Sequence, residues 1–179
     1  MEHYGLIGYP LEHSFSGRYF AEKFKQENIT DCSYELFPLS SLEEFPQLLQ
    51  QHPNLKGLNV TVPYKEEVIT YLDELDEVAG QVGAVNTINF EPNCLKGFNT
   101  DVTGFAQSIS PKLLPQHSKA LILGTGGASK AVRYVLENKG LEVSFVSRDQ
   151  EKGDLTYTDL DQALIANHQV IVNTTPVGM

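Results

Sequence analysis

The sequence predicts an α/β protein with two domains, and three observations lead to this fold class. Through the first hundred residues, short apolar strands alternate with helical segments, which favours a mixed or parallel sheet covered by helices. A polar, proline-containing stretch, SPKLLPQHSK, then interrupts the pattern at residues 110–119. After it, an apolar strand, a glycine-rich turn and an amphipathic helix follow in the order of a βαβ unit. We therefore expect one α/β domain over residues 1–102 and a second domain over residues 103–179.

In the first domain, apolar alternation predicts strands and helical spacing predicts the helices between them. The strands are expected at residues 3–9, 32–39, 55–62 and 84–90, and the helices at residues 17–29, 41–52 and 63–72. Ser16 is a suitable N-cap for the first helix. Pro46 interrupts or shifts the second helix, and Pro63 occupies the first position of the third.

The second domain is expected to begin with a helix at residues 102–109. Its strands are expected at residues 120–123, 141–148 and 169–175, with a further short strand near residue 155. Helices are expected after the glycine turn, ending at Gly140, and at residues 160–168. A doubly wound domain has about six strands, so we expect this chain to contain only the N-terminal part of one.

The composition excludes several classes of partner. The chain has 13 Lys and Arg residues and 23 Asp and Glu residues, giving a formal charge of −10. A nucleic-acid or anionic-membrane surface needs a basic patch, so we expect neither partner. No apolar run approaches the roughly 20 residues of a membrane span, and the first residues do not resemble a signal peptide. Cys32 and Cys94 lack metal or disulfide spacing and indicate a reducing compartment. We expect a cytoplasmic monomer or homodimer without a metal site.

The glycine-rich turn GTGGAS has the context of a dinucleotide-binding motif, because it joins a buried strand to a helix. Gly124 allows the tight turn, and Gly126 lets the backbone approach a pyrophosphate at the positive end of the helix. The third glycine position is Ser129, so we expect Ala128 and Ala131 to provide the close contact between helix and sheet. A glycine turn without a ligand is the alternative. The pattern favours a Rossmann domain.

The end of the next strand indicates which dinucleotide binds. An NAD site has Asp or Glu there to bind the ribose 2′-hydroxyl, whereas this chain has Ser147 and Arg148. A hydroxyl and a guanidinium suit the 2′-phosphate of NADP, and Lys152 could add a second positive charge. Asp149 weakens this inference unless its side chain points elsewhere. An Arg148 that is only a solvated surface charge is the alternative.

Polar side chains in the first hundred residues gather where strands end or elements meet. In open α/β sheets, the loops beyond the carboxyl ends of strands line the ligand crevice, so these hydroxyls and amides would bind a polyhydroxylated or hydroxy-acid substrate. The candidate residues are Ser14, Ser16, Asn59, Thr61, Asn86 and Asp101.

Each of these residues also has a purely structural interpretation. Ser14 or Ser16 could cap the helix at 17–29, and Asp101 could cap the helix at 102–109. Asn59 and Thr61 could be the solvent-facing residues of an amphipathic strand. Asn86 could serve a turn.

Lys65 falls in the first turn of the helix predicted at residues 63–72, where the helix dipole disfavours a cation by roughly 0.3–1 kcal/mol. The dipole and partial burial would favour the neutral amine, which suits acid–base chemistry. A lysine and an aspartate facing a carbonyl beside a nicotinamide form a plausible dehydrogenase pair. A surface lysine balanced by Glu66 and Glu67 is the alternative.

With these residues in place, the chain resembles the shikimate dehydrogenase family of aromatic amino-acid biosynthesis. The matching segments occur in the family's order and are GLIGYPLEHSFS, GLNVTVPYK, VGAVNTI, GFNTDVTGF, LILGTGGASKAV and VNTTPVGM. The resemblance implies an NADP-binding oxidoreductase that interconverts 3-dehydroshikimate and shikimate.

The resemblance also implies roles for individual residues. Lys65 and Asp101 look like the catalytic pair. Ser14 and Ser16 look like ligands of the substrate carboxylate, and the ring hydroxyls would bind Asn59, Thr61 and Asn86. The cofactor-binding set would be Gly124, Thr125, Gly126, Gly127, Ala128, Ser147, Arg148, Lys152 and Thr174.

The chain departs from the family pattern in three places. Gly17 replaces the usual proline after the second serine, and Ser147 replaces the more usual asparagine before the arginine. The family also continues beyond NTTPVGM, so the chain looks like a truncated enzyme. The competing interpretations are a quinate/shikimate dehydrogenase that uses NAD, and a fragment or regulatory module that binds ligand without turnover.

Overall fold

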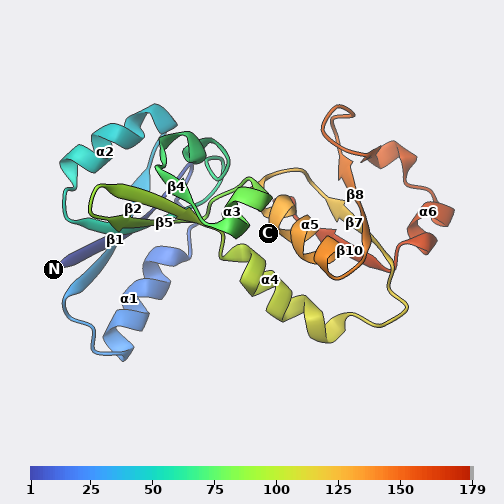
Figure 1. Cartoon of the computed structure of the whole chain (residues 1–179), viewed down its shortest axis with the longest axis horizontal. Coiled ribbons are helices and arrows are strands. Elements are labelled where there is room, and N and C mark those ends of the chain that lie inside the picture. The colour runs from blue at the N-terminus through green and yellow to red at the C-terminus, as the bar shows by residue number, and fades with distance from the viewer. Residues whose placement is uncertain (178–179) are drawn as a thin grey trace. The chain divides into compact units, whose positions relative to one another are not determined.

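The apolar strands expected in the first hundred residues pair into one mixed sheet. The structure is a computed structural model that describes residues 1–177, and the chain divides into two units. Unit 1 comprises Met1–Gln81 and Val85–Asn99, and unit 2 comprises Val82–Ala84 and Thr100–Met179. Figure 1 labels most of the helices and strands of both units, and each unit is described by itself.

The sheet of unit 1 has six strands in the order β2-β1-β3-β5-β6-β4. β1 pairs in parallel with both β2 and β3, whereas β5 runs antiparallel to β3 and β6, and β4 is parallel to β6. The strands are β1 (Glu2–Gly8), β2 (Cys32–Pro38), β3 (Leu55–Val60), β4 (Glu74–Leu75), β5 (Thr87–Glu91) and β6 (Cys94–Phe98). The mixed sheet confirms the predicted fold class for this half of the chain.

Helices cover both faces of this sheet, with α1 and α2 on opposite sides (Figure 1). The α-helices are α1 (Ser16–Gln26), α2 (Phe45–Gln51) and α3 (Glu77–Val82), and the 3₁₀ helices are η1 (Leu42–Glu44) and η2 (Glu67–Tyr71). Phe45, Ile7 and Ile88 are completely buried in the core of the unit. Pro46 lies in the first turn of α2, where the absence of its N–H costs no helical hydrogen bond.

The α-helix predicted at residues 63–72 is wrong. Residues 62–66 form turns, and only the five-residue 3₁₀ helix η2 follows them. Tyr64 accounts for the difference, because its ring is buried and its hydroxyl donates to the carbonyl oxygen of Leu39 at 2.6 Å. This long-range anchor fixes the chain in a turn after β3. Lys65 therefore does not lie in the first turn of an α-helix, and the dipole argument for it does not hold.

Two further local expectations are also corrected. Ser16 is the first residue of α1 instead of its N-cap, which is Phe15 and makes no side-chain capping bond, while the Ser14 hydroxyl accepts from the N–H of Ser16 at 3.3 Å. The sequence analysis did not predict α3 or β6. Nevertheless, β5 and β6 form a simple antiparallel hairpin across Asn93, whose φ is +61°. Asn tolerates this left-handed conformation better than most residues.

Unit 2 has a parallel four-stranded sheet in the order β10-β7-β8-β9. Its strands are β7 (Lys119–Leu123), β8 (Glu142–Ser147), β9 (Leu155–Thr156) and β10 (Val170–Asn173). Its helices are α4 (Asp101–Ile109), α5 (Gly127–Asn138) and α6 (Gln162–Asn167), with 3₁₀ helices η3 (Ser110–Lys112) and η4 (Tyr157–Asp159). The predicted short strand near residue 155 is confirmed as β9.

The βαβ unit of β7, α5 and β8 is held by its own apolar core. Ile122 and Leu136 are fully buried where the helix packs on the sheet. The helix ends at Asn138, two residues before Gly140, whose φ of +85° is readily adopted only by glycine, and the N–H of Leu141 then donates back to the carbonyl of Leu136.

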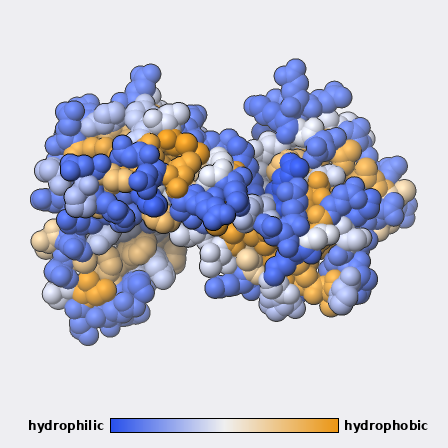
Figure 2. Space-filling view, in the orientation of Figure 1, coloured by the Kyte–Doolittle hydropathy of each residue, from blue (hydrophilic) through white to orange (hydrophobic). Residues whose placement is uncertain are grey.

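Polar and charged residues occupy much of the surface seen in Figure 2, with apolar residues gathered in patches between them. None of the helices within residues 1–177 combines the length and the apolar character that crossing a membrane requires.

Candidate active site

In unit 1, the loop after β1 and the turn after β3 meet at one edge of the sheet. Because β1 and β3 are parallel neighbours, their carboxyl ends lie side by side. The backbone N–H of Tyr9 donates to the carbonyl of Val62 at 3.0 Å, which ties the two loops together. Thr61 approaches β1 closely, since a Cβ at Gly8 would clash with its methyl carbon. The fold thus brings Thr61 close to the loop that carries Ser14.

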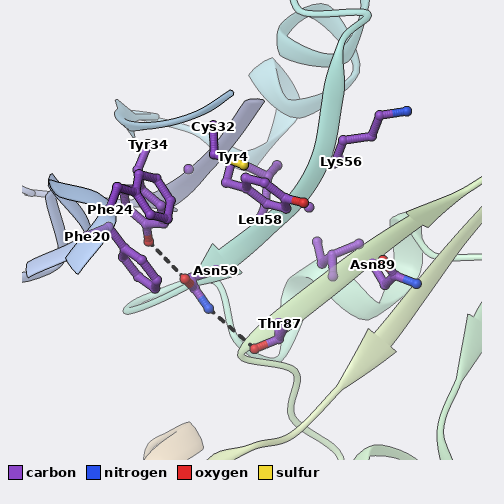
Figure 3. Close-up of a pocket in the computed structure, with 13 residues that line it drawn as sticks. Tyr4, Phe20, Phe24, Cys32, Tyr34, Lys56, Leu58, Asn59, Thr87 and Asn89 are labelled. Atoms are coloured by element: carbon purple, nitrogen blue, oxygen red, sulfur yellow. Dashed lines mark hydrogen bonds between the residues drawn. The ribbon is translucent and has the colours of Figure 1, made fainter. Parts of the chain in front are cut away.

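Asn59 is held by polar partners from two other strands (Figure 3). The hydroxyl of Tyr34 donates to Asn59 Oδ1 at 2.8 Å, and Asn59 Nδ2 donates to the hydroxyl of Thr87 at 3.3 Å. Thr87 in turn donates to Oδ1 of Asn86 at 3.1 Å. Asn86 is 9% exposed, so its amide is largely withdrawn from water. The predicted substrate residues Asn59 and Asn86 therefore belong to one hydrogen-bonded network.

Tyr34 is the centre of this network. Its ring stacks on Phe20 of α1, with centroids 4.2 Å apart and an interplanar angle of 17°. Burial raises the pKa of its phenol to about 12, and a hydrogen bond with the Ser16 side chain acts in the opposite direction. Tyr34 thus connects Ser16, in the first turn of α1, to the amides on the neighbouring strands.

Lys65 is half-buried in the turn that follows β3. Its carbonyl oxygen accepts a hydrogen bond from the backbone N–H of Val85 at 2.7 Å. Val85 directly precedes Asn86, so the backbone that carries the lysine is fixed to the segment that carries the buried amide.

An apolar cavity of unit 1 lies beside this polar network, and Tyr34, Asn59 and Thr87 line part of it. It has a volume of about 340 Å³ and lies between the aromatic side chains of α1 and the strands β1, β3 and β5 (Figure 3). Of the predicted substrate residues, only Asn59 lines it. Hydroxyl and carboxylate groups need polar partners, so we place the candidate substrate site at the polar edge instead.

Asp101, the second predicted catalytic residue, belongs to unit 2. It is the first residue of α4, and the N-cap position is Thr100. The alternative prediction, that Asp101 is the N-cap of this helix, is therefore wrong.

The glycine turn of unit 2 has the geometry that a dinucleotide phosphate needs. Gly124 has a φ of +105°, and a Cβ there would lie 3.0 Å from Oγ1 of Thr174. Gly126 is the N-cap of α5, and a Cβ there would meet nothing within 4 Å. The open space beside Gly126 leaves the backbone N–H groups at the start of α5 accessible to an anion, so these residues fit NADP.

Ser129 replaces the expected small residue without loss of packing. It is completely buried, and its hydroxyl donates to the carbonyl of Gly126 at 2.6 Å. Ala131 is buried as expected, but Ala128 is exposed, so the expectation that Ala128 packs between helix and sheet is wrong. The helix rotation that buries positions 129 and 131 turns position 128 outward.

The loop after β8 presents Arg148 to solvent. Asp149, which follows it, directs its carboxylate into its own loop, where Oδ1 accepts from the N–H of Glu151 at 3.0 Å and Oδ2 lies 3.7 Å from Nζ of Lys152. Ser147 is buried, and its hydroxyl accepts from the N–H of Asp149 at 3.1 Å. The carboxylate of Asp149 is therefore bound within its own loop. It does not argue against a phosphate beside Arg148.

Sequence reasoning missed Tyr34 and Thr87, which hold the two amides in place. Both lie on strands that are distant from Asn59 in sequence, and their hydroxyls look like ordinary strand residues. A signal was present at Thr87, because it directly follows Asn86 in the AVNT segment.

Comparison with known proteins agrees with this geometry. The model of the shikimate dehydrogenase substrate binding domain matches residues 6–88. The NADP(+) shikimate dehydrogenase of Methanosphaera stadtmanae is 37% identical over 194 residues, an alignment that covers 98% of this chain and 68% of the relative.

Solved structures give the same result. The shikimate dehydrogenase 1 of Peptoclostridium difficile superimposes with a TM-score of 0.82 at 35% identity, over 100% of this chain and 68% of that one. Shikimate 5-dehydrogenase of Thermus thermophilus, solved with NADP(H) and shikimate, has a TM-score of 0.77 at 30% identity, over 98% of this chain and 69% of that one. This chain belongs to the shikimate dehydrogenase family.

Proposed function

We propose that this protein catalyses the reversible, NADPH-dependent reduction of 3-dehydroshikimate to shikimate. The observation that carries the proposal is the similarity over 98% of the chain to an NADP(+) shikimate dehydrogenase. The polar network of unit 1 and the open glycine turn of unit 2 support it, because they offer partners for a hydroxylated ring and for a dinucleotide. The domains proposed are residues 1–102 for substrate and residues 103–179 for NADP. The cytoplasmic location expected from the sequence stays a prediction.

In this proposal the polar edge of unit 1 binds the substrate. Ser14 and Ser16 donate to the carboxylate, and Asn59, Thr61 and Asn86 bind the ring hydroxyls. The hydrogen bonds of Tyr34 and Thr87 to the two amides support this assignment, since they fix which atoms of Asn59 face each neighbour. A preorganised amide binds a hydroxyl without first paying the entropy of immobilisation.

In unit 2 the proposed cofactor residues hold NADP by its phosphates and ribose. Gly124–Ala128 and Thr174 surround the pyrophosphate, and Ser147, Arg148 and Lys152 select the 2′-phosphate. When bound, the reduced nicotinamide supplies the hydride. Lys65 and Asp101 act as the acid–base pair in proton transfer to the substrate carbonyl oxygen. That oxygen becomes the hydroxyl of shikimate when the carbonyl is reduced.

The proposal is tested by mixing the purified chain with 3-dehydroshikimate and following the loss of NADPH absorbance, with NADH in parallel. Oxidation of NADPH well above that of NADH supports the proposal and its cofactor choice. Equal use of the two cofactors would remove the argument from Arg148. Shikimate binding measured by calorimetry without turnover would support the interpretation as a ligand-binding fragment instead.

A Lys65→Ala variant tests the proton role. We expect its shikimate affinity to stay within a few-fold of that of the unmodified chain, while turnover falls by about 10²–10⁴-fold because general acid–base catalysis is lost. A folded Lys65→Ala protein with undiminished kcat would refute the role.

A further inference from the structure

Two histidines and a glutamate, none of them among the residues proposed to bind substrate or cofactor, converge in unit 1. His3 lies at the amino end of β1, Glu35 lies on β2, and His52 is the C-cap residue of α2. One ligand atom from each residue lies within 4.8 Å of the other two. Side chains alternate between the two faces of a strand, so Glu35 points to the opposite face of β2 from Tyr34, which contacts the proposed substrate residue Asn59. The cluster unites three elements that are distant in sequence.

The donor atoms of the cluster are accessible and available. His3 Nε2 and Glu35 Oε2 are 3.8 Å apart, and their side chains are 31% and 53% exposed. Among residues 1–177, no hydrogen bond occupies a ring nitrogen of either His3 or His52. An imidazole nitrogen can bind a metal only when it is free of a proton or another partner, so this availability is required.

Packing holds the ring of His52 in place, whereas the exposed carboxylate of Glu35 can move. The ring of His52 packs edge-on against Phe37, with centroids 4.8 Å apart, and lies 6.1 Å from the ring of His3. Ligands at 2.0–2.2 Å around a tetrahedral ion lie roughly 3.4 Å from one another. The cluster reaches that spacing if the exposed carboxylate of Glu35 and the ring of His3 move inward by about 1 Å, which side-chain rotation allows.

We propose that His3, Glu35 and His52 form a binding site for a divalent transition metal, with Zn²⁺ as the favoured ion. Two imidazoles and one carboxylate are ligands that suit Zn²⁺, whereas Ca²⁺ and Mg²⁺ prefer sites made of oxygen alone. Three protein ligands leave the fourth position to water, because the cluster is open to solvent. The bound ion ties β1 and β2 to the end of α2, and it stabilises unit 1 because the unfolded chain does not hold these residues together.

The test is titration of tag-free, metal-free protein with ZnCl₂, followed by calorimetry and by thermal unfolding with and without EDTA. We expect one equivalent of Zn²⁺ to bind and the unfolding temperature to rise. Cu²⁺ and Ni²⁺ are avoided, because their square-planar preference also allows binding to backbone nitrogens beside His3.

Matched variants separate this cluster from general surface binding. Glu35→Gln changes an exposed carboxylate without altering its shape, and His52→Gln removes the packed imidazole; each is expected to weaken Zn²⁺ binding at least tenfold and to abolish the thermal shift. His13→Gln, an exposed histidine outside the cluster, should bind like the unmodified chain. Unfolding in EDTA shows that each variant is folded. The site is refuted if Glu35→Gln binds Zn²⁺ as tightly as His13→Gln, or if the unmodified chain shows no saturable binding of one equivalent.

Discussion

Tyr34 shows how a residue outside any motif can shape a binding site. The sequence placed Asn59 in the candidate site because it ends a strand in a polar segment, but it offered no reason for the orientation of the amide. In the structure, the Tyr34 hydroxyl donates to Oδ1 of Asn59, and Thr87 accepts from Nδ2. These opposed contacts distinguish the two ends of the amide and fix which one is an acceptor.

Removing the Tyr34 hydroxyl should therefore weaken substrate binding. Tyr34→Phe keeps the ring stacked on Phe20 but leaves Oδ1 of Asn59 without this donor, and a hydrogen bond of this kind contributes about 0.5–1.5 kcal/mol. We expect shikimate affinity, measured by calorimetry, to fall by about three- to tenfold.

The matched control is Tyr4→Phe. The hydroxyl of Tyr4 also belongs to a strand residue that lines the cavity, but it donates to the exposed carboxylate of Glu2 at 2.9 Å. Its loss should leave shikimate affinity unchanged. Equal affinities for the two variants would show that Tyr34 does not position Asn59.

Tyr34 should also lower the free energy of unfolding as the pH becomes alkaline. Burial raises the Tyr34 pKa to about 12 from its ordinary value of 10, so the folded state favours the neutral phenol. The associated stabilisation is complete below pH 10 and is lost as the pH rises from 10 towards 12. Urea unfolding at about pH 8 and pH 11 should therefore show a steeper loss of stability for the unmodified chain than for Tyr34→Phe. Other tyrosines titrate in both proteins, so a stability difference that stays constant between the two pH values would contradict this assignment.

At the scale of elements, the turn between β7 and α5 contains two glycines, Gly124 and Gly126, that serve different purposes. Gly124 is required by the backbone, because its φ is +105° and a Cβ would crowd Thr174 and Thr175. Gly126 has an extended conformation and open space around its Cβ position, so folding does not require it. Its use is to leave room for a ligand.

Substitution by alanine tests this distinction. We expect Gly124→Ala to lower the free energy of unfolding by about 1–3 kcal/mol, as for other strained backbone positions. Gly126→Ala should fold with nearly unchanged stability but bind NADPH at least tenfold more weakly, because its methyl group enters the space for the phosphates. NADPH binding followed by fluorescence, with unfolding measured on the same samples, checks both outcomes. Unchanged NADPH affinity in Gly126→Ala would place the phosphates elsewhere.

Elements specified by local signals were predicted well from the sequence. The strand, glycine turn and helix of residues 119–138 were identified because the apolar run, the glycines and Gly140 all lie next to one another in the chain. The helix predicted at residues 63–72 failed for the opposite reason. Its turn depends on the contact between the Tyr64 hydroxyl and Leu39, which no local pattern encodes. The hydroxyl of Tyr34 was missed in the candidate site for this same reason, because its contact with Asn59 joins residues 25 positions apart.

At the scale of the whole molecule, each unit has its own apolar core. Ile88 lies in the core of unit 1 and Ile122 in that of unit 2, and both are completely buried on strands. The two cores are distinct clusters of residues. A chain organised in this way does not have to unfold in a single step.

We therefore predict two thermal transitions that respond to different ligands and variants. Ligands stabilise the unit that binds them, so shikimate should raise the transition of unit 1 and NADPH that of unit 2. Ile88→Val and Ile122→Val are matched changes that each remove one buried methylene and cost about 0.5–1.5 kcal/mol. In scanning calorimetry, Ile88→Val should lower the transition that shikimate raises, and Ile122→Val the transition that NADPH raises. A single transition, moved equally by both variants and by both ligands, would mean that the two cores unfold as one cooperative body.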